Sequence, residues 1–229
     1  MKIIAIGDIH GRKVWEEIVK ESADRYVFIG DYFDTHGTET AHQQMVNFEK
    51  ILDFKEANPT KVVLLIGNHD FHYLTVAGRD RYSGFQDHHW EMIRELLEPA
   101  IEHGYLQMAY EEDGVLYTHA GVTKTWYKGI DLGLAPAKNI NRAFASVPEL
   151  FRFTMGKNAS PYGDDVTQSP IWVRPESLEE DAIGGYKQVV GHTQGEDIIL
   201  QGNFAFIDAL GTSGEFLEVD NGKFKIRKI

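Results

Sequence analysis

The feature that most constrains this chain is a recurrence, in which five short apolar runs are each followed within four residues by Asp, Asn or His. The runs and the polar residues behind them are residues 3–6 with Asp8 and His10, 26–29 with Asp31, 62–66 with Asn68, 115–117 with His119, and 188–190 with His192. Runs of this length, rich in β-branched residues, are typical of buried strands. Open α/β folds bind ligands at the carboxyl ends of their strands. The sequence therefore predicts that these polar side chains meet in a crevice.

The first third of the chain predicts alternating strands and helices. Residues 12–23 and 40–57 carry apolar side chains at helical spacing, and each segment lies between two predicted strands. This order, with right-handed crossovers, implies a parallel sheet whose carboxyl ends share one edge. Residues 74–84 lack periodicity and are expected to form a loop over that edge, and 89–103 indicate a third long helix.

The second half of the chain predicts a second sheet. A hairpin is expected around residues 111–114. Short strands are predicted at 197–201, 204–208, 216–219 and 224–227. The last two are joined through Asn221 and Gly222, a favoured tight turn. We expect this second sheet to be antiparallel.

Residues 134–185 break the pattern and are interpreted as a variable cap. A helix is predicted there over 136–153. The chain of 229 residues suits one large core. We therefore expect a single α/β domain over residues 1–229.

The composition restricts both the chemistry and the location. The chain has no cysteine, so any metal must be held by oxygen and imidazole nitrogen, and a cytoplasmic protein is expected. We expect neither a secretion signal nor a membrane span. The formal net charge of −12 at pH 7 disfavours sequence-independent binding to nucleic acid, which depends on clustered Lys and Arg.

The polar residues at the strand ends predict a pair of metal ions. Asp8 and His10 are two residues apart, and extended backbone would point both side chains the same way. The five strand ends supply two Asp, one Asn and three His, which is more than one tetrahedral ion needs. They fit two ions if one carboxylate bridges them. Such a pair lowers the pKa of a shared water and holds both the entering and the departing oxygen of a phosphoryl transfer.

His69 is the candidate general acid. It follows Asn68 directly, and neighbouring side chains diverge, so His69 can face the substrate instead of the ion. Asp34, close behind Asp31, can fix its tautomer. The alternative is that His69 merely supports the metal ligands.

Five motifs run in order along the chain: GDIHG at 7–11, GDYFD at 30–34, GNHD at 67–70, HAG at 119–121 and GHT at 191–193. Together they resemble the motifs of the calcineurin-like metallophosphoesterases, most closely the serine/threonine phosphoprotein phosphatase branch with its bacterial and phage relatives. The resemblance implies two mixed β-sheets packed as a sandwich and flanked by helices. It also implies two divalent ions, with manganese expected and iron or zinc as alternatives. By this resemblance Asp8, His10 and Asp31 hold one ion, Asp31, Asn68, His119 and His192 hold the other, and His69 with Asp34 forms the acid pair.

Two departures help to choose between branches of this family. Diesterase-like branches usually place a second histidine where this chain has Gln194, which favours the phosphatase pattern. That pattern also continues its second motif with Arg-Gly, whereas Thr35 and His36 stand here, so one phosphate-binding arginine is missing.

A stretch in the cap offers a replacement for the missing arginine. The WVRP stretch at 172–175 resembles the Trp-x-Arg stretch of bacterial phosphatases and of symmetrical dinucleoside tetraphosphate hydrolases. Arg174 is therefore the candidate phosphate ligand, and a surface role is its alternative. Arg79 and His36 are weaker candidates.

The leading hypothesis is a metal-dependent phosphomonoesterase, similar to Ser/Thr protein phosphatases, in which a metal-bridging hydroxide attacks the phosphorus. A nucleotide or dinucleoside polyphosphate hydrolase of the same superfamily is the enzyme alternative. A catalytically inert, metal-free scaffold is the third reading, but none of the ligand residues is lost. The expected substrates are phosphorylated proteins or small phosphorylated metabolites and nucleotides, and the oligomeric state is left open.

Overall fold

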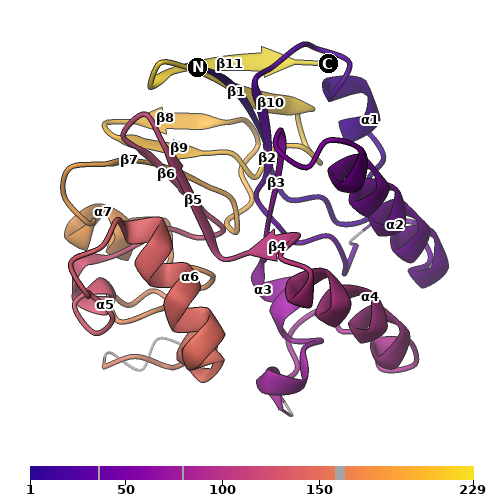
Figure 1. Ribbon diagram of the computed structural model, residues 1–229, viewed down its shortest axis with the longest axis horizontal. Helices are drawn as coiled ribbons and strands as arrows, with labels where there is room; N and C mark the ends of the chain where they lie inside the picture. Colours follow the sequence, from indigo (N-terminus) through magenta and orange to yellow (C-terminus); the bar gives the residue numbers. More distant parts are fainter. Residues whose placement is uncertain (36, 79, 158–162) are drawn as a thin grey trace.

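The computed structural model describes residues 1–35, 37–78, 80–157 and 163–229. Strand β1 (Lys2–Ile6) has apolar side chains on both of its faces, and both faces are buried. Ile3 and Ala5 pack into a core between two sheets, whereas Ile4 and Ile6 pack against helices. Successive side chains of a strand point to opposite faces, so a continuous apolar run is buried from both sides. The side chains of strands β2 and β3 also alternate between the core that lies between the sheets and the core beneath the helices. The result is an α/β fold of two packed sheets with helices outside them (Figure 1).

The first sheet contains the parallel strands predicted from the alternation of strands and helices. Its order is β11 (Lys223–Lys228), β10 (Glu215–Asp220), β1, β2 (Arg25–Phe28), β3 (Val62–Leu65) and β4 (Leu106–Gln107). Strands β1 to β4 are parallel, and β10 is antiparallel to β1 and β11. Helices α1 (Trp15–Ile18), α2 (Ala41–Ala57) and α4 (Trp90–Glu102) lie along its outer side (Figure 1).

The second sheet is mixed, so the prediction of an antiparallel sheet is wrong. Its order is β5 (Ala109–Glu112), β6 (Val115–Thr118), β7 (Lys187–Val190), β9 (Phe204–Phe206) and β8 (Ile199–Gln201). Strands β6, β7 and β9 are parallel, and only the edge strands β5 and β8 are antiparallel to their neighbours. Helices α5 (Lys124–Tyr127), α6 (Pro136–Ser146) and α7 (Pro175–Asp181) lie on its side of the molecule (Figure 1).

The final hairpin joins the first sheet instead of the second. Strand β10 pairs with β1 from Lys2 opposite Asp220 to Ala5 opposite Leu217. A free edge on β1 would expose unpaired backbone groups, and the returning chain covers it. The turn at Asn221 and Gly222 has φ values of 47° and 73°, as a tight two-residue hairpin turn requires.

The segment 105–110, which precedes the predicted hairpin, crosses between the sheets. Strand β4 belongs to the first sheet and β5 to the second, with Met108 between them. The N–H groups of Met108 and Ala109 both donate to Oδ1 of Asn141, at 2.9 and 3.0 Å. This asparagine on α6 therefore accepts the hydrogen bonds of two backbone N–H groups at the point where the chain passes from one sheet to the other.

Two predicted helices are shorter in the structure. Helix α1 has only four residues, because Lys20 and Glu21 close turns three residues back and the Glu21 carbonyl accepts the hydroxyl of Tyr26 at 2.6 Å. Helix α6 ends at Ser146, and a 3₁₀ turn (Pro148–Phe151) follows it. Proline disfavours helical backbone in the residue before it, and Val147 has φ −145°. The interpretation of 134–185 as a cap on a single domain stays a prediction.

None of the described helices is long and apolar enough to cross a membrane.

Candidate metal centre

The predicted ligand residues lie in the loops that leave five parallel strands. Asp8 and His10 follow β1, Asp31 and Asp34 follow β2, Asn68 and His69 lie on the one-turn helix α3 (Asn68–Phe71) after β3, His119 follows β6, and His192 follows β7. All are buried except His69 and His192, which are half-buried. The structure thus gathers residues from both sheets at one place.

The backbone reaches this place by left-handed turns. His10, Asp31, Asp34 and His192 have φ between 43° and 67° and are four of the six non-glycine residues with positive φ in the described chain. The expectation of extended backbone between Asp8 and His10 is therefore wrong. The turn still brings both side chains together with Asp31, with one ligand atom of each within 4.8 Å of the others. Asp, Asn and His tolerate this conformation better than most residues, and strained turns of this kind gather at functional sites.

Glycines let the loops pass close to the two carboxylates. A Cβ on Gly67 would overlap Oδ1 of Asp31, and a Cβ on Gly191 would overlap Oδ1 of Asp8. The loop after β3 is thereby seated on Asp31 and the loop after β7 on Asp8. The glycine before each ligand is required by this contact.

The first group of candidate ligands contains Asp8, His10 and Asp31. Nδ1 of His10 lies 2.7 Å from the carbonyl oxygen of Phe33, so it carries the ring proton and donates it there. The other nitrogen, Nε2, then presents its lone pair 3.8 Å from Oδ2 of Asp31. This separation suits two ligand atoms on one ion.

The second group contains Asn68, His119 and His192. Oδ1 of Asn68 lies 2.8 Å from Nε2 of His119 and 2.9 Å from Nδ1 of His192. The other ring nitrogens face backbone carbonyls, at 3.1 Å from Ile29 for His119 and 3.2 Å from Trp172 for His192. Each histidine is therefore placed between two acceptors.

One ring proton cannot serve both of these acceptors. Burial lowers the pKa of His119 and of His192 well below the usual value, so neither ring carries a second proton. One nitrogen of each ring must then direct a lone pair at an oxygen. A divalent cation among these atoms removes the repulsion, so the donor set fits a metal ion.

Asp31 links the two groups. Its Oδ2 lies 3.8 Å from Nε2 of His10 and 3.4 Å from Nε2 of His119, and its Oδ1 accepts the backbone N–H of His69 at 2.9 Å. Burial and the charges of Asp8 and Asp70 raise the pKa of Asp31 well above its ordinary value. Burial and Asp208 do the same to Asp8. Both carboxylates therefore need positive charge beside them to remain ionised.

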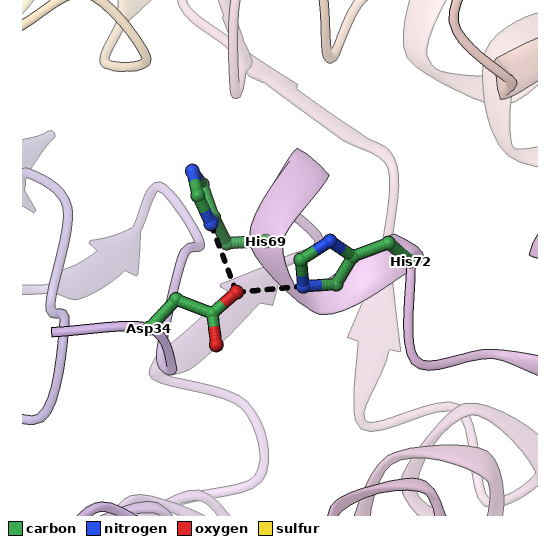
Figure 2. A group of neighbouring side chains, drawn as sticks. All are labelled: Asp34, His69 and His72. Carbon is green, nitrogen blue, oxygen red and sulfur yellow. Dashed lines mark hydrogen bonds and ion pairs between the residues drawn. The ribbon is translucent and has the colours of Figure 1, made fainter. Parts of the chain in front are cut away.

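A second cluster surrounds Asp34, which follows Asp31 by three residues. Nδ1 of His69 lies 2.9 Å from Oδ2 of Asp34, as the predicted acid pair requires, and Nε2 of His72 lies 2.6 Å from the same oxygen (Figure 2). These three residues also offer one ligand atom each within 4.8 Å of one another, as a metal site requires. Both nitrogens, however, face the same carboxylate oxygen, and ring N–H protons satisfy that arrangement without a cation.

The charge of Asp34 is satisfied within the protein. Burial alone would raise its pKa, but the hydrogen bonds and charges of His69 and His72 lower that pKa to about 2. Its other oxygen accepts the hydroxyl of Tyr73 and, at 3.2 Å, the side-chain amide of Gln86. The ring of His69 also stands edge-on to His10, with centroids 5.3 Å apart, so the predicted acid pair adjoins the candidate metal ligands.

Arg174 lies beside the candidate centre. Its Nη1 donates to the carbonyl oxygen of His192 at 3.3 Å and to Oγ1 of Thr193 at 3.1 Å. Burial lowers the pKa of Arg174, while Asp164 and Asp31 oppose that change. His36 and Arg79, the weaker candidates, lie outside the described residues.

Sequence reasoning gave no role to three buried residues of this region: His72, Asp70 (quoted only as part of the GNHD motif) and Asp208. His72 follows His69 by three residues and so lies on the same side of the turn, a spacing that would have identified it. Asp208 follows β9 in the same way that the predicted ligands follow their strands. Asp70 accepts the N–H groups of Gly67, Asp31 and Tyr32 at 2.8–2.9 Å and so joins the loops after β2 and β3.

Comparison with known proteins gives a family and a fold. A family model described as calcineurin-like phosphoesterase matches residues 1–193. No curated protein matches the chain. Among solved structures, a cold-active protein-tyrosine phosphatase from a psychrophilic Shewanella species is 19% identical, with a TM-score of 0.67, over 98% of this chain and 77% of that one. A protein serine/threonine phosphatase from Saccharomyces cerevisiae, similar to human phosphatase PP5, is 17% identical, with a TM-score of 0.56, over 100% of this chain and 80% of that one.

Proposed function

The chain belongs to the calcineurin-like phosphoesterase family, and we propose that it is a metal-dependent phosphomonoesterase of the Ser/Thr protein phosphatase type. The observation that carries the proposal is the meeting of two clusters, one that requires cations and one that can supply a proton. They adjoin where the rings of His10 and His69 stand 5.3 Å apart. Phosphate ester hydrolysis needs both functions, because charge develops on the phosphoryl oxygens and the leaving oxygen must be protonated.

We propose that two divalent ions bind here, held by Asp8, His10 and Asp31 on one side and by Asp31, Asn68, His119 and His192 on the other. When bound, such ions lower the pKa of a water and neutralise the developing charge on the phosphoryl group. Oxygen and imidazole ligands suit manganese, with iron and zinc as alternatives. The lack of cysteine supports a cytoplasmic location.

We assign the remaining steps to His69, Asp34 and Arg174. The carboxylate of Asp34 accepts a hydrogen bond from Nδ1 of His69, and Nε2 of the imidazolium form gives its proton to the leaving oxygen, which leaves a neutral ring. Figure 2 shows that this second nitrogen points away from Asp34. We propose that the planar guanidinium of Arg174, which lies beside His192 and Thr193, binds two phosphate oxygens at once.

The preference for monoesters rests on two observations. Gln194 stands where diesterase-like relatives place another histidine, and a monoester has an additional charged oxygen for Arg174 to bind. The substrate would be a phosphorylated protein or a small phosphorylated metabolite. Nucleotides and dinucleoside polyphosphates are the competing substrates.

The test is a panel of substrates after removal and replacement of the metal. Manganese-loaded protein is assayed with phosphoserine and phosphotyrosine peptides, nitrophenyl phosphate, bis(nitrophenyl) phosphate, ATP and diadenosine tetraphosphate. We expect the monoesters to have the highest kcat/KM and the metal-free protein to be inactive. Faster cleavage of the diester or of the dinucleotide would reject the phosphomonoesterase assignment.

A further inference from the structure

Two histidines of one helical turn share a single carboxylate oxygen. His69 and His72 lie three residues apart, on and directly after α3, and both ring edges face Asp34 (Figure 2). Their nitrogens are 2.9 and 2.6 Å from Oδ2 of Asp34. The acid pair assigned above is therefore one half of a His–Asp–His arrangement.

The position of the proton on His72 follows from its surroundings. Among the described residues, Nδ1 of His72 is buried without a hydrogen-bond partner. Nε2 touches Oδ2 of Asp34 at 2.6 Å, although its direction departs from that of an ordinary hydrogen bond. A lone pair at that distance from an ionised carboxylate would be repelled. A neutral imidazole has one proton, so His72 carries it on Nε2.

Packing alone does not require a histidine at position 72. The ring is fully buried, lies parallel to Tyr82 with centroids 5.8 Å apart, and meets Tyr73 and Phe85 edge-on at 4.6 and 4.9 Å. An apolar ring would fill this place without the cost of burying a ring nitrogen that lacks a partner. The contact of Nε2 with Asp34 is what a histidine adds.

The contact leaves Asp34 with one available orientation. Tyr73 and Gln86 donate to Oδ1, while His69 and His72 occupy Oδ2. A carboxylate fixed at both oxygens cannot rotate, so the ring that it holds cannot tilt. Small displacements of an acid from its substrate are costly, because proton transfer requires hydrogen-bond reach.

We propose that His72 is a positioning residue, which locks the Asp34 carboxylate so that His69 is held with Nε2 toward the leaving oxygen; this deepens the proposed function and rests on it. His72 itself touches neither substrate nor metal. The role depends on the HDFH sequence at 69–72, in which the second histidine follows the first by three residues, close to one helical turn.

Kinetics of two matched variants test the proposal. His72→Phe keeps an aromatic ring between Tyr82 and Phe85 but loses the donor, and His72→Gln restores a donor at similar reach. For His72→Phe we expect kcat on a phosphoserine peptide to fall about tenfold with KM nearly unchanged, and little loss on nitrophenyl phosphate, whose leaving group needs no proton. His72→Gln should recover most of the activity. His88→Phe, at an exposed position, is the control.

A purely structural role for His72 predicts a different result. Both esters would then slow equally, melting temperature and metal content would fall with them, and His72→Gln would not restore the rate. That outcome, or unchanged phosphoserine kinetics in His72→Phe, would overturn the proposal.

A measurement independent of activity separates this proposal from the proposed function. Long-range proton–nitrogen NMR spectra of zinc-loaded protein, with His72→Phe for assignment, should show the Nε2–H form of His72. The Nδ1–H form would leave no proton for Asp34 and would reject the positioning role. Absence of phosphatase activity with the Nε2–H form present would reject the proposed function and its kinetic step, while confirming the contact.

Discussion

Asp31 and Asp34 are three residues apart, buried, left-handed in backbone conformation and each near two histidines, yet their electrostatics are opposite. Burial and neighbouring carboxylates raise the pKa of Asp31 well above its ordinary value. The pKa of Asp34 is lowered to about 2, because the hydrogen bonds and charges of His69 and His72 outweigh the effect of burial. The carboxylate of Asp31 has no compensating positive charge beside it, whereas that of Asp34 already has two histidine rings.

The direction of the ring protons explains this difference. Near Asp31, His10 places Nδ1 against the carbonyl oxygen of Phe33, and His119 places Nδ1 against that of Ile29. Their Nε2 lone pairs are left for Asp31, at 3.8 and 3.4 Å. Near Asp34, His69 and His72 each have a ring nitrogen beside the carboxylate, at 2.9 and 2.6 Å, and we infer that both nitrogens carry protons. The same residue types thus build a candidate cation site in one place and a candidate proton donor in the other.

The largest expected effect comes from breaking the cation side of the comparison. Asp31→Asn keeps the side-chain shape but removes the charge proposed to serve both ions. The metal ions would then stabilise the transition state by several kcal/mol less, which would lower kcat/KM by about 10³-fold or more. Elemental analysis should find fewer than two ions per chain, whereas Asp87→Asn, an exposed control, should keep both. A variant that keeps two ions and full activity would contradict the bridging role.

Breaking the proton side should have a smaller and more selective effect. His69→Asn should slow hydrolysis of phosphoserine roughly 10²–10⁴-fold, because general-acid help is worth that much when the leaving oxygen is basic. Nitrophenyl phosphate should be affected far less, and the metal content should not change. Parallel kinetics on the two esters measure this selectivity. Equal losses on both would indicate that His69 supports the metal ligands instead.

Arg174 belongs to neither cluster, so the loss of activity in an Arg174 variant can be compared with the losses in the Asp31 and His69 variants. Arg174→Lys keeps the charge but loses the planar group that binds two oxygens, so kcat/KM for monoesters should fall about tenfold. The loss should be smaller for diesters, and both metals should remain bound. Steady-state kinetics on one monoester and one diester give the result. Unchanged monoester kinetics would assign Arg174 to a structural role on the loop of His192.

The smallest effect expected is on the stability of metal-free protein, where the two clusters should respond to pH in opposite senses. Burial raises the pKa of Asp70 to about 7 and of Asp208 to about 6, and it also raises the pKa values of Asp8 and Asp31. Their protonated folded forms contribute stability that is complete below about pH 4 and is lost as pH rises toward 6–7. Asp34, with its lowered pKa, contributes stability present above about pH 4 that is lost as pH falls toward 2.

Melting temperatures of chelator-treated protein at pH 5 and pH 8 measure this response. The metal-free protein should melt several degrees lower at pH 8, and added manganese should reduce the difference. Asp208→Asn should also reduce it, because the amide removes one of the repelling charges. A metal-free protein that is more stable at pH 8 than at pH 5 would show that the buried carboxylates are already neutralised within the chain.

Much of the candidate site was readable from the sequence, because its residues are tied to strand ends. An apolar run of four or five residues is buried on both faces, and whatever follows it emerges at the carboxyl edge of a sheet. The parallel order of β1, β2 and β3 then follows from the helices between them. These local rules placed Asp8, Asp31 and Asn68 at one edge without any knowledge of distances.

Tertiary structure alone decided how those residues are oriented and which others join them. The left-handed turns at His10 and Asp31, the pairing of β10 with β1, and the approach of His72 to Asp34 all depend on segments distant in sequence. Residue type specifies how many protons a histidine can carry, but the carbonyl or carboxylate beside each nitrogen specifies where the proton lies. Sequence therefore determined the inventory of candidate ligands, and packing determined which carboxylate lacks positive charge beside it and which one is held by histidine rings.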